Sequence, residues 1–170
     1  MQRFFPVLLV ALTCAAASSL QSVMAADSLE EAEFAYDRGE YTQAARLFRP
    51  LAEQGVAAAQ FYLGVMHEKG RGVRQDYPMA LSWFHKAAAQ GYAGPQSNLA
   101  LMYERGRGVR KDVARALMWY HIAGALLPGD EGKAALKRRD YLTSKMTALQ
   151  IEQAEEMIRV CQESQYKKCD

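Results

Sequence analysis

Residues 67–76, HEKGRGVRQD, and residues 103–112, YERGRGVRKD, are two copies of one stretch that lie 36 residues apart. The likeness extends outward from them. Without a gap, 18 of the 36 positions in Gly55–Gln90 are identical to those in Gly91–Leu126. A repeat of this period is typical of stacked supersecondary units, each too small to bury its apolar face alone. The sequence therefore predicts that a repeat array forms the centre of the fold.

Each 36-residue unit has the pattern of two helices. The first helix is expected over 57–69 and 95–105, because Gly70 and Gly106 each supply a left-handed residue that ends a helix. In each unit an aspartate, Asp76 or Asp112, is placed to cap the second helix. A shorter copy precedes these units. Residues 40–55 match 76–91 at the same offset, after a tighter turn at 36–39.

The frame of the repeats resembles the Sel-one-like repeat (SLR) family, which is related to the tetratricopeptide repeats. It is carried by Ala59, Gln60, Leu63, Gly64, Gly70, Gly72, Val73, Asp76, Ala80, Trp83, Ala87, Ala88 and Gly91. Departures from the family pattern are Pro95, Ala100 and Leu126. The resemblance implies an all-α, right-handed superhelical solenoid of antiparallel helix pairs. It also implies a role in holding other proteins together.

The chain is expected to divide into three parts. Residues 1–25 form a signal peptide. Residues 26–126 hold the repeats, as a short tetratricopeptide-like unit at 28–54 and SLR units at 55–90 and 91–126. In residues 127–170 the repeat pattern stops, and two helices are expected, over 133–145 and from a Thr147–Gln150 capping box onward. Because an array needs a terminal element with a polar outer face, we interpret this part as a capping helix pair with a disulfide tail.

The first 25 residues have the features of a cleavable signal peptide. Arg3 precedes an apolar stretch over 4–12, and a small-residue region ends at Ala25. A membrane anchor is the alternative, but serine and glutamine residues interrupt the apolar run. Cleavage would leave Cys161 and Cys169, an even number that favours a structural disulfide over two free thiols or a redox pair. The expected location is the periplasm, or outside the cell after secretion.

Charge and motifs narrow the function classes. The 170-residue chain has a net charge of +2 and no dense basic block, which argues against nucleic acid as a partner. The chain has three histidines outside residues 1–25, His67, His85 and His121, of which His85 and His121 occupy the same position in successive units. No carboxylate or cysteine recurs beside that repeated pair at ligand spacing, so no metal and no cofactor are expected. Ser82 and Ser97 lie in repeat helices without the surroundings that a hydrolase nucleophile needs.

The first helix of each unit offers a candidate binding surface. One stripe holds Phe61, Val65 and Glu68, and its counterpart in the next unit holds Ser97, Leu101 and Glu104. In related superhelices the first helices line the concave side. These residues are therefore predicted to form an apolar groove with a carboxylate rim, suited to an extended or helical peptide. The alternative is that they pack against the neighbouring unit.

A second candidate is a periodic basic edge. The inter-helix loops repeat one pair of arginines, as Arg71 with Arg74 and Arg107 with Arg110. Guanidinium groups can hold a carboxylate or phosphate through two hydrogen bonds, so the four residues form a possible anion edge. A solvated edge is the alternative, since loop geometry accounts for the neighbouring glycines.

The sequence thus favours a non-catalytic module, an adaptor or scaffold in the bacterial cell envelope, with no catalytic residues. It would bind a partner protein or peptide on the concave face, without nucleic acid or a transmembrane span, and as a monomer. One alternative is a periplasmic immunity protein or inhibitor that neutralises a toxin enzyme. The other is a weak hydrolase of the β-lactamase kind, although the relatives known for that activity have a disulfide in each repeat and these repeats have none.

Overall fold

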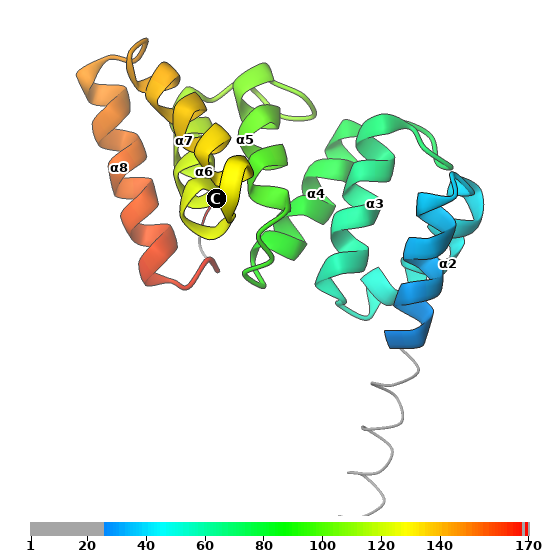
Figure 1. Cartoon of the computed structure of the whole chain (residues 1–170). Helices are drawn as coiled ribbons and strands as arrows, with labels where there is room; N and C mark the ends of the chain where they lie inside the picture. The colour runs from blue at the N-terminus through cyan, green and yellow to red at the C-terminus, as the bar shows by residue number, and fades with distance from the viewer. Residues whose placement is uncertain (1–25, 168, 170) are drawn as a thin grey trace, which may run out of the picture.

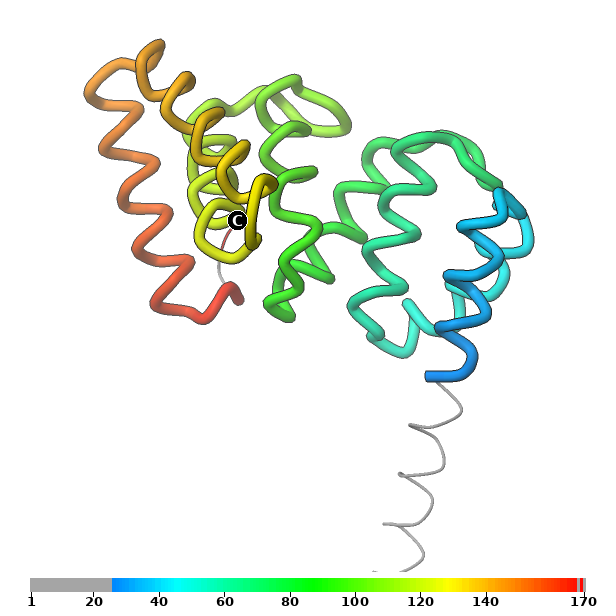
Figure 2. The backbone as a smooth tube through the Cα atoms, in the orientation of Figure 1, coloured from blue at the N-terminus to red at the C-terminus, as the bar shows by residue number. Residues whose placement is uncertain are grey.

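The computed structural model describes residues 26–167 and 169, and this part of the chain consists of helices and turns without a strand (Figure 1). Consecutive helices pair and the pairs stack into an all-α solenoid, as expected (Figure 2). The pairs are the helix at 26–37 with α2 (Tyr41–Glu53), α3 (Ala57–Lys69) with α4 (Tyr77–Ala88), and α5 (Pro95–Arg105) with α6 (Val113–Leu126). The last two helices, α7 (Gly129–Thr143) and α8 (Ala148–Glu163), were expected to form a capping pair, but each packs mainly on α6 rather than on the other. The predicted signal peptide lies outside the described residues.

The ends of the repeat helices follow from their local sequence. Gly70 and Gly106 have φ angles of 68° and 67° and end α3 and α5, so the bounds predicted for both helices are confirmed. The Asp76 carboxylate accepts a hydrogen bond from the Met79 N–H at 2.9 Å, and Asp112 accepts one from the Arg115 N–H at 3.0 Å. These caps satisfy N–H groups that the first turns of α4 and α6 would otherwise leave unpaired.

The loop between the two helices of a unit docks on the preceding unit. Gly72 lies against the backbone at the start of α2, and Gly108 lies against the backbone of Tyr77 at the start of α4. Both glycines have positive φ angles, 67° and 71°. The arginine before each one adds to the contact, since the Arg71 guanidinium lies 5.1 Å from the ring centre of Tyr41. The repeated Gly-x-Gly motif therefore joins one unit to the next.

The core consists of two apolar clusters. The first is formed by the helix at 26–37, α2 and α3, with Phe48 fully buried in it. The second runs from α4 to the C-terminal tail and buries Phe84 and Trp119. Phe61 of α3 packs against the second cluster and so connects the two.

The bounds of α7 differ from expectation, most at its start. The helix predicted over 133–145 begins at Gly129 and ends at Thr143, four residues earlier at its start. Asp130 and Glu131 lie in its first turn, where negative charge is favourable, and Gly132 packs so closely on the Leu127 carbonyl that a side chain would not fit. The Thr147–Gln150 capping box that opens α8 is present.

A disulfide fastens the C-terminal tail. Cys161 near the end of α8 is bonded to Cys169, with their Cα atoms 4.5 Å apart. Both cysteines are buried and belong to the second apolar cluster. The bond therefore holds the segment after α8 against the core. Among the described helices, none is both long and apolar enough to cross a membrane.

Candidate functional site

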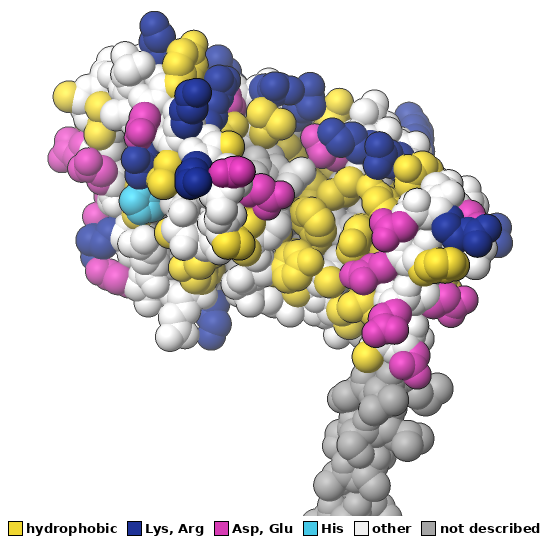
Figure 3. Space-filling model, in the orientation of Figure 1, with side chains coloured by type: hydrophobic (Ala, Val, Ile, Leu, Met, Phe, Trp, Pro, Cys, Tyr) yellow, Lys and Arg dark blue, Asp and Glu magenta, His cyan; other side chains and the backbone are white. Residues whose placement is uncertain are grey.

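A groove of about 580 Å³ runs along the first helices of successive units. Its walls come from α3, α5 and α7, and Tyr120 of α6 and Leu127, just after α6, contribute at its base. The residues that line it are Phe61, Gly94, Ser97, Asn98, Leu101, Arg105, Tyr120, Leu127, Glu131, Ala134, Ala135 and Arg138. In Figure 3, which faces this side, hydrophobic side chains gather between α7 and α3. Three of the six residues predicted for a concave groove, Phe61, Ser97 and Leu101, thus line one cavity.

Phe61 has a structural role as well as a place in the groove. Its ring centre lies 6.1 Å from that of Phe84 and 5.7 Å from that of Tyr92. A β-carbon on Gly94 would come within 3.2 Å of the Phe61 ring, so the small residue makes room for it. The two interpretations of Phe61, groove residue and packing residue, therefore both apply. Val65 is half-buried against the core and is not among the groove-lining residues.

Glu104 is bound within the chain. Its carboxylate accepts hydrogen bonds from the Arg138 guanidinium of α7 (Nε to Oε2, 3.0 Å) and from the Tyr120 hydroxyl at 2.9 Å. Burial alone would raise the pKa of Glu104, but these bonds and the positive charges of Arg138 and Arg105 outweigh it and hold the pKa below its usual value. Burial and the bond to Glu104 raise the pKa of Tyr120. The network fixes one wall of the groove to its floor.

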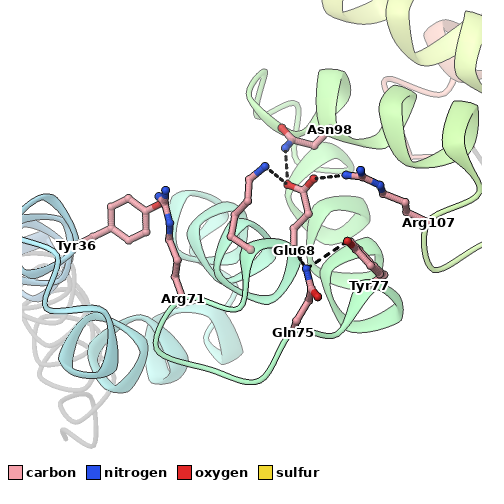
Figure 4. A network of polar contacts seen from close by, with 8 residues as sticks. Tyr36, Glu68, Arg71, Gln75, Tyr77, Asn98 and Arg107 are labelled. Atoms are coloured by element: carbon pink, nitrogen blue, oxygen red, sulfur yellow. Dashed lines mark hydrogen bonds and ion pairs between the residues drawn. The ribbon is translucent and has the colours of Figure 1, made fainter.

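Glu68, at the same repeat position, also binds inside the molecule (Figure 4). Its side chain is 3% exposed, and the Asn98 amide of α5 donates to Oε2 at 3.4 Å. Arg107 of the next unit and Lys69 each place a nitrogen 3.8 Å from a carboxylate oxygen of Glu68. In the structure both carboxylates of the predicted rim are therefore contacts between units.

An aromatic surface continues the groove toward the N-terminus. Tyr62 packs on Phe61 with ring centres 5.7 Å apart, and the Tyr92 ring centre lies at the same distance from that of Phe61. Burial raises the pKa of both tyrosines, and the negative charge of Glu33 on the helix at 26–37 adds to the effect. This end of the face is rich in acidic side chains, whereas Lys and Arg follow the edge formed by the inter-helix loops (Figure 3).

The four arginines of the predicted anion edge divide into two kinds. Arg71 donates to the Tyr36 hydroxyl at 3.0 Å (Figure 4), and Arg107 lies over the Tyr77 ring at 5.7 Å and beside Glu68. These two hold neighbouring units together. Arg74 and Arg110 are exposed and make no hydrogen bond or salt bridge in the part of the chain that the structure describes. Only the second pair is therefore free for a ligand.

The histidines lie apart from the groove lining. His85 Nε2 is 3.2 Å from the Tyr103 hydroxyl, and its ring packs edge-on against Trp119. Burial, together with the positive charge of Arg139, lowers the pKa of His121. Within residues 26–167 and 169, no group of three or more His, Cys, Asp and Glu side chains could hold a metal ion.

The sequence did not indicate the contribution of the terminal helix pair to the groove. Glu131, Ala134 and Arg138 of α7 form one wall, but α7 lies outside the repeat alignment. The spacing from Glu104 to Arg138 is 34 residues, so the 36-residue period does not predict their contact. Arg105 could have been found, because it follows Glu104 on a helix already assigned to the concave side.

The repeats and the fold place the chain in a family. Residues 57–92 and 96–126 match the Sel1 repeat. The chain is a Sel1-repeat protein. Such repeats generally mediate protein–protein interaction and are generally non-catalytic. Among curated proteins, none has significant similarity to this chain.

The solved structures that are similar to this one include two SLR or Sel1-repeat proteins. The first is c5321, a protective antigen present in uropathogenic Escherichia coli strains that displays an SLR fold, with 30% identity and a TM-score of 0.74 over 85% of this chain and 30% of that protein. The second is a Sel1 repeat protein from Oxalobacter formigenes, with 32% identity and a TM-score of 0.62 over 69% of this chain and 46% of that protein. This Sel1-repeat chain thus spans less than half the length of either relative.

Proposed function

We propose that this protein is a non-catalytic adaptor that holds a peptide or an exposed loop of a partner protein in the groove between α3, α5 and α7. The main support is the 580 Å³ groove itself, in which Phe61 and Leu101 offer apolar surface to a ligand. Apolar anchors in a preformed concavity are typical of protein-binding sites. Because packed helices already hold the groove in place, binding requires little ordering of the scaffold.

The charges around the groove suggest the chemistry of the partner. The Arg105 guanidinium lines it and makes no hydrogen bond or salt bridge among the described residues. Glu33 and Asp37, on the helix at 26–37, lie close enough to the aromatic surface to raise the pKa of Tyr62. A segment with an apolar centre, an acidic group toward α5 and a basic group toward the N-terminal helix would match this pattern.

Affinity capture with matched variants tests the proposal. Leu101→Asp places a charge on the α5 wall of the groove, and Met79→Asp places one on the exposed surface of α4, where the methionine side chain is already 43% exposed. We expect wild type and Met79→Asp to retain one partner from an envelope extract and Leu101→Asp to lose it, with circular dichroism unchanged. A partner that all three proteins retain would contradict the proposal. A toxin enzyme as the captured partner would identify the adaptor as an inhibitor.

We also propose that the protein is exported to the periplasm or beyond. The signal-peptide pattern at residues 1–25 supports this, and so does the Cys161–Cys169 disulfide, because such bonds persist in oxidising compartments. The similar Escherichia coli protein is described as a protective antigen, which agrees with exposure outside the cytoplasm. Cell fractionation with intact-mass measurement tests the proposal. A cytoplasmic protein that retains residues 1–25 would contradict it.

A further inference from the structure

A second cleft, of about 490 Å³, lies between the α5–α6 loop, the start of α6 and the start of α8. It shares no lining residue with the groove. Its lining includes three cations, Arg110, Lys111 and Arg115, and two amides of α8, Gln150 and Gln153. The cleft therefore brings together a repeat loop and the start of α8, which the sequence places about 40 residues apart.

One of the three cations is held in a fixed position. The Arg115 Nε lies 3.3 Å from the Asp112 carboxylate, and its guanidinium lies 5.6 Å from the ring centre of Tyr103. The Tyr103 hydroxyl accepts from Arg115 at 3.5 Å and is also 3.2 Å from His85 Nε2. A guanidinium held in this way loses little side-chain freedom when it binds a ligand.

The remaining donors also line the cleft. Arg110 and Lys111 make no hydrogen bond or salt bridge in the described part of the chain. The Gln150 side-chain oxygen accepts from the Thr147 N–H at 3.0 Å, which directs its amide nitrogen away from the capping box. Three cations face one carboxylate, Asp112, so the cleft has an excess of two positive charges.

This cluster of charge belongs to one unit only. In the preceding unit, the positions of Arg110, Lys111 and Arg115 hold Arg74, Gln75 and Met79. The unit at 55–90 therefore has one cation at these three positions, whereas the unit at 91–126 has three. The cationic cleft is therefore not a general consequence of the repeat, and the preceding unit shows that the same backbone folds without it.

We propose that this cleft binds a phosphate group, as the free dianion or as a small phosphate monoester. Two excess positive charges match a dianion, and guanidinium and amide donors match its oxygens. Toward α8 the cleft opens into a hollow that shares Asp112, Arg115 and Gln153 with it and adds the carboxylates of Glu152 and Glu156, and Arg159 already pairs with Glu156 at 2.6 Å. Because the carboxylates of that hollow repel an anion, we expect the phosphate to bind at the other end of the cleft, beside Arg110 and Lys111.

The preceding unit supplies the test variant. Lys111→Gln with Arg115→Met introduces the residues that unit already has at those positions, so the helix pair is expected to fold. Arg74→Gln removes an exposed cation at the position that matches Arg110 and serves as the control. Inorganic phosphate and glycerol phosphate are titrated separately by calorimetry into the purified proteins, in chloride buffer at constant ionic strength, to distinguish the two sources.

Wild type and Arg74→Gln are expected to bind at least one of the two ligands saturably, and the double variant to bind it about tenfold more weakly or not at all. An equal loss in Arg74→Gln would show general attraction to basic surface and overturn the proposal. Binding that the double variant retains, or no saturable binding to wild type, would also overturn it. Circular dichroism and thermal melting of each variant separate loss of the site from loss of the fold.

Discussion

A β-carbon on Gly108 would lie 2.5 Å from the carbonyl carbon of Tyr77. The loop of one unit is thus pressed against the first turn of the second helix in the unit before it. Gly72 makes the same approach to α2. A side chain at either position meets backbone, which cannot move aside as a flexible side chain can.

Gly72→Ala is expected to destabilise the protein by more than its positive φ angle alone accounts for. The matched control is Gly91→Ala, because Gly91 also has a positive φ, 76°, but open space around it. The control should lower the free energy of unfolding by about 1–2 kcal/mol, and Gly72→Ala by roughly 1–3 kcal/mol more. Urea unfolding measures both. Equal losses would show that the loop does not need its close approach to α2.

A second prediction concerns the packing of α3 on α4. A β-carbon on Gly64 would come within 2.5 Å of the Phe84 ring, whereas the next unit has alanine at the equivalent position, Ala100. Gly64→Ala should therefore destabilise the fold by about 1–3 kcal/mol through overpacking, although alanine is the better helix former. A rise in the free energy of unfolding would mean that Phe84 moves aside at no cost.

The pH dependence of stability should show two windows. The pKa of His121 is lowered in the folded protein, so the unfolded chain binds a proton first and stability falls as the pH drops below about 6.5. The pKa of Glu104 is lowered as well, so its contribution is present above about pH 4.5 and is lost as the pH falls further.

Single substitutions separate the two windows. His121→Gln should flatten the stability curve in the upper window and leave the lower one. Glu104→Gln should reduce the lower slope and also cost about 1–2 kcal/mol at neutral pH, because it weakens the bonds to Arg138 and Tyr120. Chemical unfolding at a series of pH values measures both effects. Unchanged slopes in the variants would assign the titration to other groups.

Reduction of the Cys161–Cys169 bond should loosen the tail. The bond closes a short loop, with a sequence separation of 8, so its loss is expected to lower the free energy of unfolding by about 2–3 kcal/mol on the chain-entropy model. Intact mass should rise by about 2 Da on reduction, since two hydrogens are added. A mass that does not change would show that the purified chain contains free thiols.

Much of the fold could be predicted because its signals are local. Gly70, Asp76 and their repeats fix helix ends through backbone conformation and capping, and these effects depend on a few neighbouring residues. The start of α7 was misplaced because Gly129 and Gly132 resemble loop residues. In the structure Gly132 is small because Leu127 leaves no room for a side chain.

The candidate site was less predictable because it depends on contacts between units. The spacing along the first helices was enough to place Phe61, Ser97 and Leu101 in the groove. It could not show that Glu104 would bind Arg138, since α7 has no counterpart in the repeat. Nor could it separate Arg71, which packs on the preceding unit, from Arg74, which does not.

Photo-crosslinking from inside the groove tests most directly whether a partner binds there. A photoreactive residue replaces Ser97, which is half-buried in the groove, and in a control protein it replaces Met79 on α4. We expect one partner to crosslink from position 97 and not from position 79, and Leu101→Asp to abolish that product. Crosslinking from position 79 alone, or a product from position 97 that survives Leu101→Asp, would contradict binding in the groove.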